Sequence, residues 1–226
     1  AEGCAILALK RLDDARRDGD TIHAVIRGIG LSNDGRGKGL LVPDESGQQR
    51  AMRAAYADAG IDPAQVSLLE CHATGTSLGD ATELGSMQRI WANGLKIGSH
   101  KSNFGHAITV AGMSGLLKVL DSIEGSEISP TIHCDEPIEL AAQPFDLITS
   151  PRAWDGRYAG VNAFGFGGNN AHVLIERPGF EPGPIAPPPA REPIALVASW
   201  MRVGDLEGTD QVFDAFLSNA KLDLEM

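Results

Sequence analysis

Residues 160–172 read Gly160-Val-Asn-Ala-Phe-Gly-Phe-Gly-Gly-Asn-Asn-Ala-His172, and this stretch does most to decide the fold. The small and apolar residues over 160–164 and 171–175 predict two strands, and the glycines between them predict a hairpin with unusual backbone angles. Such a loop can aim backbone N–H groups at a developing oxyanion. It is not a dinucleotide-binding loop, because Asn170 stands where that pattern needs a third glycine.

Upstream of this hairpin, strand-like and helical patterns alternate, which predicts a layered α/β fold with a mixed sheet. Ser46 should cap a helix that Gly60 ends, and Asn33-Asp-Gly35 should form a turn. The strand over 3–9 should be buried on both faces. Further strands are expected at 21–29, 66–71 and 95–99, and helices at 12–17, 46–59, 82–92 and 110–123.

The C-terminal part of the chain has a different composition. The proline-rich stretch 178–193 predicts a linker or a wrapping tail after a domain over 1–177. Beyond it, 194–197 is strand-like and 210–217 helical, so 194–226 is interpreted as the truncated start of a following domain or as part of the tail. The first residues resemble neither an initiating methionine nor a signal peptide, so we expect the native N-terminus to lie elsewhere.

Composition excludes several classes of function. A net charge of −11 argues against nucleic acid and against an anionic membrane surface as partners. No apolar run is long enough to span a bilayer. The three cysteines form no close pairs, which favours a reducing, cytoplasmic setting over a disulfide framework.

Two further segments carry side chains suited to catalysis. His72 follows a strand, and its neutral imidazole can donate an N–H to a substrate oxygen, while Thr74 and Thr76 can line one side of a channel. Lys101 and His106 suit a loop that enters a helix, and the ammonium group should keep the imidazole neutral. Taken singly, His72 is better explained as a structural histidine and Lys101 as a solvated surface charge.

The cysteines offer no convincing nucleophile. Cys71 and His72 are neighbours on a strand and point to opposite faces, so Cys71 is better explained as a buried, inert thiol, and Cys134 is interpreted in the same way. No cysteine or histidine spacing supports a zinc site. Gly35-Arg-Gly-Lys-Gly39 fails as a phosphate loop, because no Ser or Thr follows its lysine.

Three ordered motifs resemble the β-ketoacyl synthase (ketosynthase) family. They are Glu70-Cys-His-Ala-Thr-Gly-Thr-Ser-Leu-Gly-Asp80, Gly98-Ser-His-Lys-Ser-Asn-Phe-Gly-His106 and the stretch 160–172. The likeness extends to Asn33-Asp-Gly-Arg36 and Ala1-Glu-Gly3 and covers about 1–177. The likeness is greatest to multidomain polyketide, modular fatty-acid and polyunsaturated fatty-acid synthases. The tail faintly resembles the opening of another ketosynthase-like domain, as in a tandem of a ketosynthase and a chain-length factor.

The resemblance implies the second half of a thiolase-like fold and a decarboxylative Claisen condensation. In that reaction an acyl group rides on a cysteine, a malonyl group on a carrier protein loses CO2, and the resulting carbanion attacks the acyl thioester. The two histidines would hold the malonyl thioester oxygen, the lysine would act electrostatically, and the phenylalanine would gate the site and contribute its N–H. The matching positions are His72, Lys101 and His106 as catalytic, Thr74, Thr76 and Phe166 as substrate-binding, and Glu83 as supporting.

The resemblance also implies partners. The nucleophilic cysteine would lie upstream of this chain, in a missing N-terminal half, and the full protein would be a homodimer. No cofactor would bind directly, because an acyl carrier protein delivers the phosphopantetheine, whose amides Thr74 and Thr76 would contact. We expect the isolated chain to expose apolar surface.

Two departures from the family and two alternative functions remain. Ala81 replaces a usual proline, and Ala107-Ile-Thr-Val110 replaces a Thr-Glu-Ala-Ala-like stretch, which can reshape the acyl pocket.

A non-catalytic chain-length-factor-like or decarboxylase-only subunit is one alternative. A thiolase is the other, but residues 160–172 lack the second cysteine that thiolases use.

Overall fold

The computed structural model describes residues 1–35, 39, 42–92, 94–138 and 144–180, together with 202–203, 206–207, 210–211 and 214. The chain forms two compact units, Ala1–Pro187 and Pro188–Met226. Within the second unit, β9 (Arg202–Val203) pairs with β10 (Leu206–Glu207) in an antiparallel ladder.

The first unit alternates helices and strands along the chain. Its helices are α1 (Leu12–Asp18), α2 (Glu45–Ala59), α3 (Ser77–Gln88), α4 (Lys101–Phe104) and α5 (Ala111–Gly125), with 3-10 turns η1 (Pro63–Gln65), η2 (Ile108–Val110) and η3 (Phe166–Gly168). Its strands are β1 (Val25–Asn33), β2 (Val66–Glu70), β3 (Leu95–Gly98), β4 (Glu127–Ile128), β5 (Phe145–Leu147), β6 (Arg152–Ala153), β7 (Tyr158–Gly165) and β8 (Asn169–Glu176).

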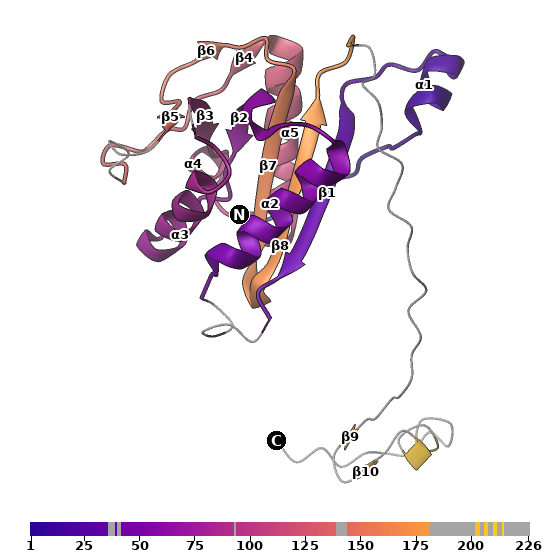
Figure 1. The fold of residues 1–226 in the computed structure, drawn as a ribbon, viewed down its shortest axis with the longest axis vertical. Coiled ribbons are helices and arrows are strands. Elements are labelled where there is room, and N and C mark those ends of the chain that lie inside the picture. Colours follow the sequence, from indigo (N-terminus) through magenta and orange to yellow (C-terminus); the bar gives the residue numbers. More distant parts are fainter. Residues whose placement is uncertain are drawn as a thin grey trace. The chain divides into compact units, whose positions relative to one another are not determined.

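A six-stranded mixed sheet in the order β1-β8-β7-β2-β3-β5 forms the centre of this unit (Figure 1). The neighbours from β7 through β2 and β3 to β5 are parallel, whereas β8 pairs antiparallel with both β1 and β7. The predicted layered α/β fold with a mixed sheet is therefore confirmed, and so is the hairpin of β7 and β8.

Helices cover both faces of the sheet, α2 and α3 on one and α5 on the other. Neighbouring strand residues divide between the two cores, as their alternation requires. Leu69 and Leu174 pack in the core with α2 and α3, while Leu68 and Ile175 pack in the core with α5.

Helix α2 lies unusually close to strand β1. An added Cβ at Gly30 would lie 1.8 Å from the backbone oxygen of Ala51, and one at Gly28 would lie 2.4 Å from that of Ala55. Only glycine fits at these two positions while α2 stays in contact with the strand.

The prediction of a buried strand over 3–9 is wrong. These residues form no regular structure, and Ile6 is 94% exposed. Apolar composition measures the tendency to be buried, but a strand also needs a neighbour that accepts its backbone hydrogen bonds. The next strand, β1, begins and ends later than predicted and runs over Val25–Asn33.

Two helices begin earlier than predicted because their caps are elsewhere. Asp44, not Ser46, caps α2, since its side chain accepts the backbone N–H groups of Ser46 and Gly47. Thr76 caps α3 by accepting the N–H of Gly79, so this helix starts at Ser77 instead of residue 82. Gly60 ends α2 in the left-handed conformation, as predicted.

The predicted elements of the tail lie almost wholly outside the described residues. This applies to the strand over 194–197, to most of the helix over 210–217, and to the linker beyond residue 180. No helix in the described part of the chain combines the length and apolar character needed to cross a membrane.

We predict that Gly30→Ala lowers the free energy of unfolding by about 3 kcal/mol, because the new methyl group forces α2 away from β1. Gly125→Ala is the matched control. Its Cβ would enter open space at the end of α5, so stability should stay unchanged or rise by up to about 1 kcal/mol. Thermal and urea unfolding measure both, and equal stability of the two variants would contradict the close packing described here.

Candidate functional site

The candidate site lies where three strands end together. Because β2, β3 and β7 are parallel, their carboxyl ends meet at one edge of the sheet. His72 follows β2, Lys101 and His106 follow β3, and the turn Phe166–Gly168 follows β7. The three motifs found in the sequence are thus brought together by the sheet.

A cavity of about 850 Å³ opens at this edge. Of the residues predicted to form the site, six line it: His72, Thr74, Thr76, Glu83, His106 and Phe166. Lys101 does not line the cavity, although it lies close enough to act on the imidazoles electrostatically. Apolar side chains, including Met113 and Leu116 of α5, complete the wall.

The two imidazoles face each other across a short distance. The ring centroids of His72 and His106 are 5.5 Å apart and the planes are nearly perpendicular. The ring of Phe164 lies 6.0 Å from His72, while Phe166 is 72% exposed at the cavity. At this separation the two imidazoles border the same part of the cavity.

A backbone contact fixes the tautomer of His106. The N–H of Ile108 donates to His106 Nδ1 over 3.0 Å, so a neutral imidazole must carry its proton on Nε2. Ile108 has a φ of 46°, which is a strained angle for a β-branched residue. The departure at Ala107–Val110 therefore includes a strained residue that helps to orient the imidazole.

A buried carboxylate holds the loop of His72 in place. Glu83 Oε1 accepts the backbone N–H of His72 at 2.9 Å, and Oε2 accepts that of Ala73 at 2.8 Å. Ala73 has a φ of 31°, which non-glycine residues rarely adopt. Burial raises the pKa of Glu83, while these backbone N–H groups act in the opposite direction.

Two polar residues that sequence reasoning missed extend this network. Asn162 donates its side-chain amide to Glu83 Oε1 at 2.8 Å, and its Oδ1 lies 2.7 Å from His172 Nδ1. Because Asn162 Oδ1 is an acceptor, His172 donates here, and burial lowers the pKa of its imidazole to about 3. The two residues lie opposite each other in the β7–β8 register, which the sequence pattern did not reveal.

Burial and a nearby ammonium group keep both cavity histidines neutral. Burial lowers the pKa of His72 to about 3, and the positive charge of Lys101 adds to this effect. The same two causes lower the pKa of His106. Burial also lowers the pKa of Lys101, against the opposing effect of Glu70 and Glu83. Lys101 thus acts on the imidazoles in the direction expected from the sequence.

The turn at Asn33 holds the glycine loop from outside. The Asn33 side-chain amide donates to the backbone oxygen of Gly167, and the Asp34 N–H donates to that of Gly168. Gly167 and Gly168 have φ of 78° and 71°, and an added Cβ at Gly168 would lie 2.6 Å from Asp34 Cβ. The loop therefore needs glycine both for its backbone angles and for this contact.

The two threonines contact each other on one side of the cavity. Their hydroxyl oxygens are 3.1 Å apart, and Thr76 Oγ1 also accepts the N–H of Gly79. Thr74 is left with a hydroxyl group that can turn towards a bound molecule.

No cysteine is suited to act as a nucleophile here. Cys4, Cys71 and Cys134 are all free thiols, and no cysteine is among the described residues that line the cavity. Burial, followed by the negative charge of Glu83, raises the pKa of Cys71 well above its usual value. Cys71 is therefore an inert thiol, as its position on the strand led us to expect.

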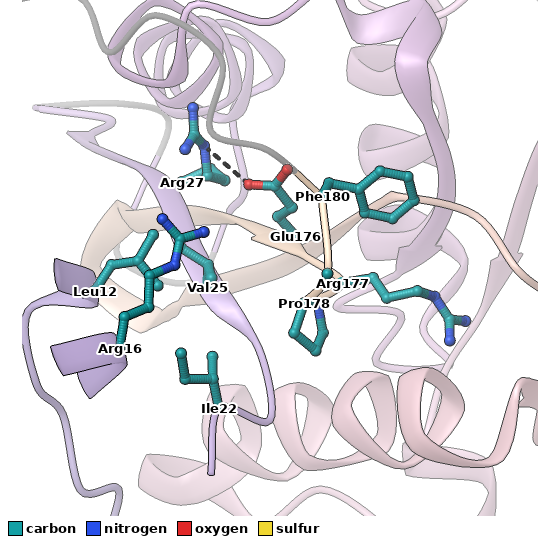
Figure 2. A pocket seen from close by; sticks show the side chains of 10 residues that line it. Leu12, Arg16, Ile22, Val25, Arg27, Glu176, Arg177, Pro178 and Phe180 are labelled. Carbon is teal, nitrogen blue, oxygen red and sulfur yellow. Dashed lines mark ion pairs between the residues drawn. The ribbon is translucent and has the colours of Figure 1, made fainter. Parts of the chain in front are cut away.

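A second, smaller cavity of about 410 Å³ lies at the other end of β8 (Figure 2). None of the residues predicted to form the site lines it. The buried carboxylate of Glu176 pairs with Arg27 at 3.4 Å and with Arg157 at 2.6 Å. Of the charged residues that line this cavity, Glu176 and Arg27 thus pair with each other, which favours a structural role for these two side chains.

Two family models match the chain. The model described as the C-terminal domain of β-ketoacyl synthase matches residues 23–135, and that of the ketoacyl-synthetase C-terminal extension matches residues 135–204.

Curated relatives are much longer than this chain. The highly reducing polyketide synthase Preu1 of Preussia isomera is 42% identical over 187 residues, which are 77% of this chain and 8% of the relative. The pikromycin polyketide synthase component PikAIII of Streptomyces venezuelae is 39% identical over 206 residues, which are 84% of this chain and 13% of the relative. The chain thus spans only about a tenth of their length.

Solved structures of the same fold also match. The PfaC ketosynthase–chain length factor superimposes with a TM-score of 0.80 and 39% identity, over 93% of this chain and 24% of that one. The ketosynthase from module 6 of the bacillaene synthase of Bacillus subtilis 168 superimposes with a TM-score of 0.71 and 35% identity. The match covers 74% of this chain and 33% of that one. The predicted thiolase-like fold of the ketosynthases is confirmed.

We predict that the His72 imidazole stays neutral down to about pH 4 and that Lys101→Met raises its pKa. Removing the ammonium group makes the imidazolium less unfavourable, so the pKa rises, but it stays below the ordinary value of about 6.5 because the burial remains. Titration followed by NMR of the imidazole signals measures both values. Lys10→Met, which removes a lysine on the surface, is the control. An unchanged His72 pKa in Lys101→Met would show that the two groups do not interact.

Proposed function

The chain belongs to the β-ketoacyl synthase family of condensing enzymes, and from that premise we propose that its cavity decarboxylates a malonyl thioester for condensation with an acyl thioester. The breaking C–C bond leaves its electron pair on the former malonyl unit as an enolate, and CO2 departs. The enolate carbon then attacks the acyl thioester, expels the thiolate and forms a β-ketoacyl product. In this reaction the thioester oxygen of the malonyl unit becomes negatively charged.

The observation that carries this proposal is the pair of neutral imidazoles on one cavity. His106 presents Nε2–H as a donor, and His72 lies with its ring 5.5 Å away. Donors fixed in advance around a developing oxyanion stabilise the transition state more than the ground state. Lys101 supports the site electrostatically without touching the substrate, and Glu83 supports the loop of His72.

The site also suits a substrate delivered on a long arm. We infer that an acyl carrier protein brings the malonyl group on phosphopantetheine, with Thr74 and Thr76 along the arm and Phe166 as the gate at the cavity. The protein would need no cofactor bound directly. We also propose a cytoplasmic location, because the three cysteines form no disulfide framework.

The nucleophile must come from outside these residues, because none of the three thiols is suited to the task. We propose that an N-terminal half of the same enzyme supplies a cysteine, that this half packs on the present chain, and that the full-length enzyme is a homodimer. Exposed apolar residues on β1 support the contact. Ile29 is 48% and Leu31 is 70% exposed. Both side chains lie on the face of the sheet that packs against α5, but α5 covers this face mainly at β7 and β2.

One observation favours a second candidate. The structure that matches over 93% of this chain contains a chain length factor as well as a ketosynthase. A chain-length-factor-like or decarboxylase-only subunit would keep the fold without forming a carbon–carbon bond. If the chain, once combined with its N-terminal half, releases CO2 but forms no β-ketoacyl product, this second candidate is correct.

We predict that His106→Ala lowers CO2 release from a malonyl-carrier protein by about 10²- to 10³-fold, because one oxyanion donor is lost. The assay needs this chain together with its N-terminal half and quantifies released CO2. His23→Ala, which removes an exposed histidine far from the cavity, is the matched control and should retain full activity. Equal activity of the His106 and His23 variants would remove the basis for the proposal.

We further predict that the isolated chain self-associates through the exposed face of β1. Replacing both Ile29 and Leu31 with Glu should shift the sedimentation profile towards monomer and weaken binding of the N-terminal half at least tenfold. Ala64→Glu adds a negative charge in η1, outside this face, and should change neither property. A monodisperse, cooperatively melting monomer before any substitution would contradict the prediction.

A further inference from the structure

A cluster of three buried ionisable side chains lies beneath the proposed catalytic loops. Glu70, His100 and Lys118 are almost fully buried. Glu70 Oε1 lies 2.7 Å from His100 Nδ1 and also accepts the His100 backbone N–H at 2.6 Å. Glu70 Oε2 lies 3.1 Å from Lys118 Nζ. None of the three lines the cavity, so none can touch a substrate bound there.

Each member of the cluster belongs to a different segment of the site. Glu70 ends β2, just before His72. His100 follows β3 and directly precedes Lys101. Lys118 lies in α5, which follows His106 and forms part of the cavity wall. A single carboxylate thus joins the three segments that carry the proposed catalytic groups.

The tautomer of His100 follows from its hydrogen bond with Glu70. An ionised carboxylate can only accept hydrogen bonds, so His100 donates its Nδ1–H to Glu70. Within the described part of the chain, His100 Nε2 then has no hydrogen-bond partner, and Lys118 Nζ makes no hydrogen bond of good geometry besides its ion pair. Buried groups that are left partly unsatisfied are costly, and they are kept where they fix a geometry.

The surrounding backbone is shaped to admit the cluster. An added Cβ at Gly115 would lie 3.0 Å from Glu70 Cγ and 3.5 Å from His100 Nδ1. At Gly98 it would lie 3.3 Å from Lys118 Nζ. A side chain at either position would crowd the cluster, so glycine allows the backbone to pack closely against these three side chains.

We propose that Glu70, His100 and Lys118 are positioning residues that hold the loop of His72 against the loop of Lys101 and His106. This inference rests on the proposed function. It explains how the two imidazoles keep the spacing that they need if both donate a hydrogen bond to one oxygen. The helix that starts at Lys101 has a single turn and needs such an anchor, because short helices are unstable by themselves.

The test is a structural signature of the histidine pair, measured in the 226-residue chain with labelled histidines. The nuclear Overhauser effect between the ring protons of His72 and His106 reports their contact directly. His100→Leu should weaken this signal at least threefold and shift the imidazole resonances of both rings. His100→Asn should restore it, because the Asn amide nitrogen can occupy the position of Nδ1 and donate to Glu70.

Met52→Ala is the control for a general loss of stability. It creates a cavity in the core with α2 and α3, away from the cluster, and should lower the melting temperature while leaving the signal between the rings unchanged. If His100→Leu also keeps that signal, the cluster is merely structural and the proposal is wrong.

If His100→Leu fails to fold, the comparison of His100→Asn with His100→Gln decides. The Gln amide reaches the position of Nε2 and not that of Nδ1. His100→Gln should therefore lose the signal between the His72 and His106 rings that His100→Asn keeps. Equal spectra of the two variants would overturn the proposal. None of these measurements depends on turnover. Absence of CO2 release by the parent enzyme would therefore refute the proposed function without deciding this inference.

Discussion

The parallel alignment of β2, β3 and β7 is the constraint on which the site depends. Parallel strands end at the same edge of a sheet, so the residues that follow them are brought together however far apart they are in the sequence. His72, His106 and the turn at Phe166 share one cavity for this reason. The antiparallel hairpin of β7 and β8 then returns the chain to the same sheet and places the glycine loop beside the histidines.

Two buried carboxylates convert this general placement into a defined geometry. Glu83 accepts backbone N–H groups from the loop of His72, and Glu70 accepts one from His100 at the start of the next loop. A backbone N–H group that loses its partner away from water costs free energy, so each of these contacts favours the observed loop conformation. The carboxyl groups and the loops therefore depend on each other. The loops donate N–H groups to the buried carboxyl oxygens, and these contacts hold the loops in conformations as strained as that of Ala73.

The sequence predicted what is local and missed what is long-range. The three motifs are contiguous, so the side chains around the cavity could be named, and the alternation of strands and helices was sufficient for the mixed sheet. The contacts of Asn162 with His172 and of Glu70 with His100 depend on strand register, which no contiguous pattern encodes. The strand expected over 3–9 failed for a related reason, since a run of apolar residues says nothing about which strand will pair with it.

The neutrality of the imidazoles bears on how the proposed reaction would be accelerated. An imidazolium would bind the malonyl carboxylate in the ground state, and binding that is equal in ground and transition state does not speed the chemical step. A neutral N–H donor interacts modestly with a thioester oxygen and more strongly once that oxygen carries negative charge. Burial and Lys101 both lower the pKa of His72 and so keep its imidazole neutral. In the proposed reaction, a neutral donor stabilises mainly the negative charge that develops as CO2 leaves.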